Sequence, residues 1–156
     1  MRNSAALVVA LLITCSKPVP VTPSQPYTGP VITLPDGYTV RIEVAADDQT
    51  RAQGLMYRDR VPVGAGMLFF FPQSGEYPFW MKNTLVPLDM IWIDDQKRVV
   101  HVESNVPPCK ADPCPSYPPH AQAKYVLELG AGEAGKHQVA NGSTLKFERL
   151  DNIVIR

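Results

Sequence analysis

The sequence predicts a mainly β fold, namely a single antiparallel β-sandwich or barrel with one or two short helices. Three observations support this prediction. Short apolar or alternating segments recur at close spacing from residue 38 onward, turn residues separate them, and one segment carries a helix start signal. The chain has 156 residues, of which 45% are hydrophobic and 19% are charged, as in one globular domain with one core.

The domain begins with a predicted strand and a short helix. Residues 38–45, YTVRIEVA, alternate between apolar and polar side chains, which is typical of a half-buried strand. Asp47 or Asp48 then follows and can cap a helix in DDQTRAQGLMYR, because a side-chain oxygen there accepts from the free amides of the first turn. Gly54 weakens this helix, so we expect it to be short.

Two apolar runs come next. The run GMLFFF at residues 66–71 is short enough to be a buried strand, and Pro72 is expected to end it. After a turn, PFWMK at residues 78–82 is expected to form another strand.

The second half of the domain predicts a hairpin and two further strands. Residues 89–93 and 98–104 are apolar segments joined by the polar turn at residues 94–97. Residues 124–129 and 143–150 alternate again. The glycine-rich segment between them is expected to hold one short helical turn at most, with His137 in solvent.

The first thirty residues predict export and a lipid anchor. Residues 1–14 have an early arginine and a short apolar run, as in a signal peptide, and the run is too short to span a membrane. The following LITC resembles a bacterial lipoprotein processing site, which would lipidate Cys15; a conventional signal peptide is the alternative. Ser16 favours the outer membrane by the same resemblance, and residues 15–30 form a proline-rich tether.

The three cysteines fit this location. If Cys15 carries lipid, Cys109 and Cys114 remain as a pair in PPCKADPCPSYPP, and the periplasm is a compartment in which such a pair oxidises. We therefore predict a Cys109–Cys114 disulfide. A zinc site involving flanking histidines and a redox-active dithiol are alternatives, although neither spacing is typical of those sites.

The charge of the chain disfavours one class of partner. Fifteen basic and fifteen acidic residues give a formal net charge of zero. A nucleic-acid partner is therefore not expected, because such proteins carry basic patches. No residue pattern indicates a cofactor or a metal.

The order of five motifs is specific. RAQGLMYR, GMLFFF, FWMKNT, PLDMIWID and KYVLELGAG, between residues 51 and 132, resemble in order and spacing the bacterial and archaeal family known as domain of unknown function 192. The resemblance covers roughly residues 38–150. It implies a compact domain of the jelly-roll sandwich type, often exported, and it implies no activity.

The candidate ligand site lies around FWMKNT. If this segment is extended, Trp80, Lys82 and Thr84 share one face and combine an aromatic platform with a cation and a hydroxyl. Such a face can hold a sugar or an anionic small molecule. The alternative is that Trp80 is core and that Asn83 and Thr84 only shape a turn. The complete predicted set is Arg51, Trp80, Lys82, Asn83, Thr84 and Asp89.

Two alternative functions would use other residues of these motifs and the strand that follows them. A carbohydrate-active enzyme would use Asp89 and Glu103 as its two carboxylates, which must then face one groove. Copper(I) handling would use methionine sulfurs from Met56, Met67, Met81 and Met90, although methionine is also a common core filler. No G-x-S-x-G motif predicts a hydrolase triad.

Together these features predict a lipid-anchored periplasmic protein, which contacts the membrane through Cys15. Its domain, residues 31–156, is expected to bind a small polar or sugar ligand or an envelope protein, and thus to be a binding module rather than an enzyme.

Overall fold

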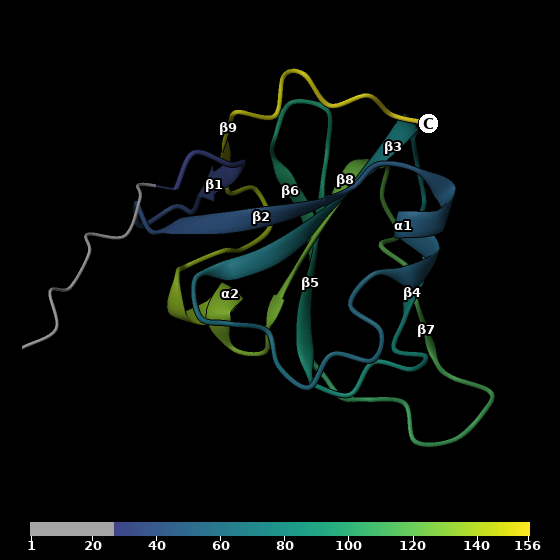
Figure 1. Cartoon of the computed structure of the whole chain (residues 1–156). Helices are drawn as coiled ribbons and strands as arrows, with labels where there is room; N and C mark the ends of the chain where they lie inside the picture. Colours follow the sequence, from purple (N-terminus) through teal and green to yellow (C-terminus); the bar gives the residue numbers. More distant parts are fainter. Residues whose placement is uncertain (1–26) are drawn as a thin grey trace, which may run out of the picture.

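The computed structural model describes residues 27–156. The predicted signal peptide, Cys15 and most of the tether lie outside the described residues. The fold is a curled seven-stranded sheet with the order β6-β5-β8-β3-β2-β1-β9 and a separate two-stranded sheet of β4 and β7 (Figure 1). The strands are β1 Val31–Thr33, β2 Thr39–Ala45, β3 Ala65–Gly75, β4 Phe79–Trp80, β5 Leu88–Ile93, β6 Val99–Val106, β7 Ser116–Tyr117, β8 Ala123–Gly130 and β9 Lys146–Glu148. The helices are α1 Asp48–Gln53 and α2 Glu133–Lys136.

The mainly β prediction is confirmed, whereas the wholly antiparallel arrangement is wrong at one pair. Strands β2 and β3 are parallel, with Arg41 opposite Ala65 and Ala45 opposite Phe69. The reason is the connection over residues 46–64, which contains α1 and returns the chain to the same end of the sheet. The curled sheet resembles half a barrel, and the jelly-roll arrangement of two packed sheets is not confirmed.

The helix between these strands begins as expected. Asp47 is the N-cap, and its carboxylate accepts from the Thr50 amide while the Thr50 hydroxyl lies within reach of the Asp47 amide. This reciprocal capping box satisfies two amides of the first turn. Gly54 ends the helix in a left-handed conformation, with φ of 48°, so the glycine stops α1 rather than weakening its middle.

Strand β3 lies at the centre of the sheet and is longer than expected. It runs past Pro72 to Gly75, and its pairing with β8 shifts between Phe70 and Gly75. The proline is therefore tolerated at an irregularity, where no ladder hydrogen bond is lost. Farther back, a Cβ on Gly66 would lie 2.6 Å from the Glu128 carbonyl oxygen, so β3 and β8 approach closely because residue 66 has no side chain.

The hairpin prediction is confirmed. Strands β5 and β6 pair antiparallel, and the Asp94 carboxylate accepts from the amides of Gln96 and Arg98 in the turn. The predicted strand at residues 124–129 is confirmed as β8, whereas the prediction at residues 143–150 was too long, since β9 covers only Lys146–Glu148. Among residues 27–156, no helix is long and apolar enough to cross a membrane.

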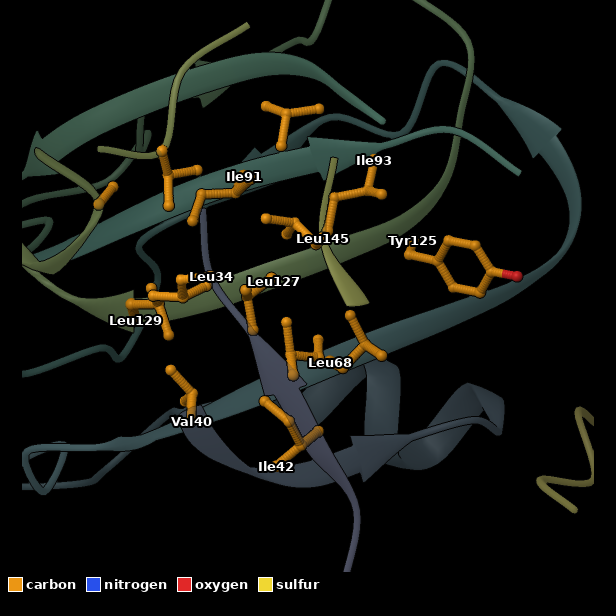
Figure 2. Close-up of a cluster of buried hydrophobic side chains, with 14 of the residues drawn as sticks. Leu34, Val40, Ile42, Leu68, Ile91, Ile93, Tyr125, Leu127, Leu129 and Leu145 are labelled. Atoms are coloured by element: carbon orange, nitrogen blue, oxygen red, sulfur yellow. The ribbon is translucent and has the colours of Figure 1, made fainter. Parts of the chain in front are cut away.

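The two faces of the curled sheet bury two different clusters. We call the side of Leu68, Ile91 and Leu127 the closed face; Figure 2 shows how side chains from several strands converge there. We call the side of Met67, Met90 and Val126 the open face. Alternate residues of the same central strands supply the two clusters, because successive side chains of a strand point in opposite directions. Figure 1 places α1, β4 and β7 together, away from α2.

Candidate functional site

A groove of about 280 Å³ lies on the open face, beside α1 and β4. Its lining is dominated by aromatic side chains and one cation, and consists of Asp48, Arg51, Ala52, Phe69, Phe71, Tyr77, Pro78, Phe79 and Trp80. Trp80 is 52% exposed, which is unusual for so large an apolar side chain. The groove is therefore an aromatic surface that is open to solvent and close to the size of a small-ligand site.

The aromatic wall is held by ring contacts. Phe71 and Tyr77 stack with centroids 3.6 Å apart, and Phe79 meets Phe69 edge-on at 4.9 Å and Trp92 at 5.8 Å. The buried Trp92 also donates from its indole nitrogen to the Tyr77 carbonyl at 2.8 Å. These contacts fix the orientation of the rings, so the wall is preorganised.

Arg51 lies at the edge of the groove but is already engaged. Its guanidinium donates to the carbonyls of Phe70 at 2.9 Å and of Arg156 at 2.7 Å, and it pairs with Asp48 at 2.7 Å. The Arg51 side chain is only 11% exposed, whereas that of Asp48 is 97% exposed. Arg51 thus connects α1, β3 and the C-terminal residue, and its charge is largely compensated.

Trp80 and Lys82 do share a side of the chain, as expected from alternation. The Lys82 ammonium stands 5.5 Å from the centroid of the Trp80 ring. It also lies 3.9 Å from the Asp112 carboxylate in the proline-rich loop, a weak and exposed pair. The cation therefore covers one end of the Trp80 ring rather than standing free.

Asn83 and Thr84 do not continue the strand. Strand β4 ends at Trp80, and Asn83 has a positive φ of 54° in a turn. The Asn83 amide donates to the Tyr57 hydroxyl at 2.8 Å, while the Thr84 hydroxyl is buried and faces the Lys82 carbonyl at 3.4 Å. Thr84 consequently points inward, away from the exposed face on which alternation would place it.

A small inner pocket of about 30 Å³ adjoins the groove. It shares Arg51, Phe79 and Trp80 with the groove, and it adds Thr84 and Glu128. Its volume corresponds to roughly one water-sized group. The structure thus brings together three of the predicted site residues, Arg51, Trp80 and Thr84, around this pocket.

Glu128 is the most unusual residue at this place. It is 5% exposed, its Oε2 is buried without a hydrogen-bond partner, and its neighbours across the sheet are Met67 and Met90. Burial raises the pKa of Glu128 to about 8, and the positive charge of Arg58 opposes this only partly. An unsatisfied buried polar group costs about 1–3 kcal/mol, so this carboxyl lowers the free energy of unfolding of the domain.

Arg58 does not neutralise Glu128 because it is paired elsewhere. Its guanidinium donates to both carboxylate oxygens of Glu43, at 2.6 and 2.7 Å. This pair lowers the pKa of Glu43 through the hydrogen bonds and raises that of Arg58. The ionised pair lies at the edge of the open face, and the acid farther in is neutral at moderate pH.

The sequence interpretation missed Glu128. The segment YVLEL predicts a strand with alternating sides, and this pattern gives no role to its single acid. The available signal was the position of that acid in a strand whose two faces are both apolar. Val126 and Glu128 share a face by alternation, so a buried Val126 predicts a buried Glu128.

Asp89 lines neither the groove nor the inner pocket. It is 0% exposed, and its two oxygens accept from the amides of Asn105 and Ala134, each at 2.8 Å. The carboxylate therefore ties β6 and α2 to β5. No ion pair joins Asp89 to Lys82 or Arg51 among the residues that the structure describes.

Asp89 and Glu103 face opposite sides of the sheet. Glu103 pairs with Met90 of the open face and lies 3.5 Å from His101, whereas Asp89 reaches Ala134 of the closed-face cluster. Directly opposed residues of an antiparallel pair project to the same side, so Glu103 belongs to the open face. Two carboxylates on opposite faces cannot flank one sugar bond, which argues against that catalytic pair.

The methionines pack as core. Met67, Met81 and Met90 are at most 6% exposed and belong to the open-face cluster. The Met56 sulfur is instead 3.8 Å from the Asn83 amide nitrogen. These positions favour core filling over copper binding. Within residues 27–156, no three His, Cys, Asp or Glu side chains are grouped as a metal site would require.

The predicted disulfide is present. Cys109 and Cys114 are bonded, with Cα atoms 5.6 Å apart. Their loop forms a hollow of about 200 Å³ together with Lys82 and Asn83. Two of the predicted site residues thus lie beside the disulfide loop rather than in the aromatic groove.

The expectation that His137 is solvated was wrong. It is 5% exposed, its ring stacks on Tyr38 at 3.9 Å, and Nδ1 lies 2.7 Å from an Asp36 carboxylate oxygen. That hydrogen bond is the main cause that lowers the pKa of Asp36. Nε2 is buried without a hydrogen-bond partner, although Glu133 Oε2 is 3.5 Å away. This cluster fastens α2 to the turn before β2.

Fold and site together define a small β domain that carries an aromatic groove above a buried neutral acid. The chain belongs to the family called domain of unknown function 192, described as an uncharacterized ACR, whose family model matches residues 31–147. The resemblance of the five motifs is thereby confirmed. No curated protein matches this chain.

Two solved structures are similar to this chain. One is described as a "putative transcription regulator" from Sinorhizobium meliloti 1021; it is 32% identical, covers 76% of this chain and 91% of its own, and has a TM-score of 0.66. The other is a protein of unknown function from Novosphingobium aromaticivorans DSM 12444, 27% identical over 78% of this chain and 89% of its own, with a TM-score of 0.67. Neither description supplies a ligand.

Proposed function

We propose that this chain is a lipid-anchored periplasmic protein, held in the outer membrane through Cys15, whose domain binds a small neutral saccharide in the aromatic groove. The observation that carries the proposal is the groove itself, in which a half-exposed Trp80 stands beside Phe79 and Tyr77. The proposal names a binding module and assigns no catalytic residue.

The chemistry of the lining favours a neutral polar ligand. Aromatic rings offer flat apolar faces, which suit the apolar face of a sugar ring. The one cation of the groove, Arg51, is compensated by Asp48 and by two carbonyls, so no free charge selects an anion. The domain is expected to meet saccharides in the periplasm, where the Cys15 anchor would hold it.

Binding is tested with the purified full-length protein and neutral oligosaccharides, including N,N′-diacetylchitobiose and soluble peptidoglycan fragments. Isothermal titration should give saturable binding to at least one of them. Trp80→Ala should weaken this binding at least about tenfold, the equivalent of about 1.4 kcal/mol. Tyr27→Ala is the matched control, since Tyr27 is 47% exposed and does not line the groove.

Trp80 also reports binding directly. The chain has two tryptophans, and Trp92 is fully buried. A saccharide stacked on Trp80 should protect its fluorescence from iodide quenching, whereas Trp92 should remain protected with and without saccharide. Binding of an envelope protein but of no saccharide would reject the proposed ligand class and favour the partner-binding alternative.

The anchor is tested in cells. Radiolabelled palmitate should be incorporated into the wild-type chain and not into Cys15→Ala, and the wild-type chain should sediment with outer-membrane vesicles. Equal labelling of both chains, or recovery of the wild-type chain in the soluble periplasmic fraction, would reject the anchor.

A further inference from the structure

The inner pocket contains a buried polar group that the lining of the aromatic groove does not include. Glu128 contributes a carboxyl whose Oε2 has no partner, in a pocket that shares five of its lining residues with the groove. A buried polar atom without a partner is rare in folded proteins and calls for an explanation.

The space in front of this oxygen depends on a glycine. Gly54, where α1 ends, lines the inner pocket, and a Cβ placed there would lie 3.9 Å from Glu128 Oε2 and 3.1 Å from Phe69. Any side chain at residue 54 would narrow the pocket at the carboxyl. The positive φ of 48° is also a conformation that glycine adopts most readily.

We propose that Glu128 is a ligand-recognition group, whose carboxyl O–H donates a hydrogen bond to the carbonyl oxygen of an acetamido group of the neutral saccharide at the inner end of the groove. The inference rests on the proposed function and assigns that site a specific polar contact. The pocket volume of about 30 Å³ admits one such oxygen-bearing group and not a whole ring.

The charged groups around Glu128 support a neutral donor. Arg58 and Glu43 form a mutual pair on the β2 side, Glu103 lies two strands away beyond Met90, and Arg51 on α1 is bonded to carbonyls and Asp48. No cation among residues 27–156 forms an ion pair with Glu128. Burial accordingly raises the pKa of Glu128 to about 8, which leaves the carboxyl protonated at periplasmic pH near neutrality.

A neutral donor restricts which ligand group can bind at this position. A protonated carboxyl offers one O–H donor, so an acceptor oxygen is favoured at this position. An acetamido carbonyl oxygen meets this requirement, because it can only accept, and it would give Oε2 the partner that it lacks. A second carboxylate from an anionic ligand would instead be repelled once Glu128 ionises.

The experiment measures the affinity of the full-length protein for N,N′-diacetylchitobiose by isothermal titration at pH 6 and pH 9.5. Wild-type affinity should be at least about tenfold lower at pH 9.5, because an ionised carboxylate cannot donate. Glu128→Gln keeps the shape and an N–H donor, and should bind at both pH values within about threefold of wild type at pH 6. Glu128→Leu should bind at least about tenfold more weakly than wild type at pH 6.

Controls separate this inference from the proposed function. Glu103→Gln changes a carboxyl on the same face that does not line the inner pocket, and should leave the affinity at pH 6 unchanged. Thermal unfolding of each variant checks that it is folded. Binding that Trp80→Ala abolishes but that is equal at both pH values, or unaffected by Glu128→Leu, would overturn the role of Glu128 and leave the groove intact. Absence of wild-type binding at both pH values would overturn both proposals.

Discussion

The closed and open faces of the sheet come from the same strands but handle polarity differently. The closed face buries one carboxylate, Asp89, and both of its oxygens accept from backbone amides. The open face uses methionines and aromatic rings, and it encloses Glu128 beneath a groove. The closed face therefore supplies stability through dense packing, whereas the open face gives up some stability to hold a polar group near solvent.

The two buried carboxyls, Asp89 and Glu128, show this difference in their hydrogen-bond partners. Asp89 receives two backbone N–H groups, so its buried charge is satisfied. Glu128 Oε2 receives none. A satisfied carboxylate fixes structure, while an unsatisfied one is available for a ligand.

The largest effect is expected at Asp89. Asp89→Ala leaves the amides of Asn105 and Ala134 buried without acceptors, and should lower the free energy of unfolding by about 3 to 5 kcal/mol. Glu103→Ala, at a half-exposed carboxyl, should change it by less than about 0.5 kcal/mol. Urea denaturation at pH 7 measures both. Similar losses for the two variants would show that the two faces do not differ as described.

The second effect is the pH dependence of stability at Glu128. The raised folded-state pKa means that the folded chain binds an additional proton between pH 4.5, the ordinary glutamate value, and about 8. This stabilisation is complete below pH 4.5 and is lost as pH rises through 8. Glu128→Gln cannot ionise and therefore lacks this loss at high pH, so the variant should be more stable than wild type at pH 9 by on the order of 2 to 4 kcal/mol, and no more stable at pH 4.5.

This second prediction is checked by guanidinium denaturation at both pH values. The comparison of the two chains at two pH values cancels contributions from all other titrating groups. A difference in stability that is the same at both pH values would show that folding does not raise the pKa of Glu128.

A smaller effect is expected from the disulfide of the proline-rich loop. Closing the short loop between Cys109 and Cys114 should stabilise the domain by about 2 kcal/mol through the entropy of the unfolded chain. The double variant Cys109→Ser and Cys114→Ser should lose this amount in urea denaturation. Amide hydrogen exchange should accelerate in β4 and β7, which pair beside the loop, and not in β8. Uniform acceleration would contradict a local role.

The smallest effect on stability is expected at the groove surface. Trp80→Ala removes a half-exposed ring and should change the free energy of unfolding by less than about 1 kcal/mol. Trp92→Phe removes a buried indole and its hydrogen bond to Tyr77, and should cost about 1 to 2 kcal/mol. Thermal unfolding of both variants gives the comparison. A larger loss for Trp80→Ala would assign Trp80 to the core.

The local elements could be predicted from the sequence because their signals are local. Alternation in TVRIEVA predicts β2, the Asp47 cap predicts α1, and the polar turn after Ile93 predicts the β5–β6 hairpin. The parallel pairing of β2 with β3 could not be read in this way. The pairing depends on which strand, distant in sequence, lies beside each strand of the sheet. Only the strand–helix–strand order indicates that β2 and β3 are parallel.

The candidate site was predictable only in part for the same reason. Trp80 was identified from an aromatic in a polar segment, and it does line the groove. Lys82 and Asn83 lie in a separate hollow, because β4 ends at Trp80 and the chain turns. Glu128 comes from a strand more than forty residues away, so only the packing of both sheet faces brings it to the same pocket. The ligand role of the predicted residues stays a prediction.

The central claim is that the open face encloses a neutral acid beneath the groove. It is tested most directly by the NMR titration of the Glu128 side-chain carboxyl carbon in the ¹³C-labelled full-length protein, assigned by the signal that is lost in Glu128→Gln. We predict a titration midpoint near pH 8, because burial of Glu128 raises its pKa to about 8. A midpoint near 4.5, the ordinary glutamate value, would contradict it.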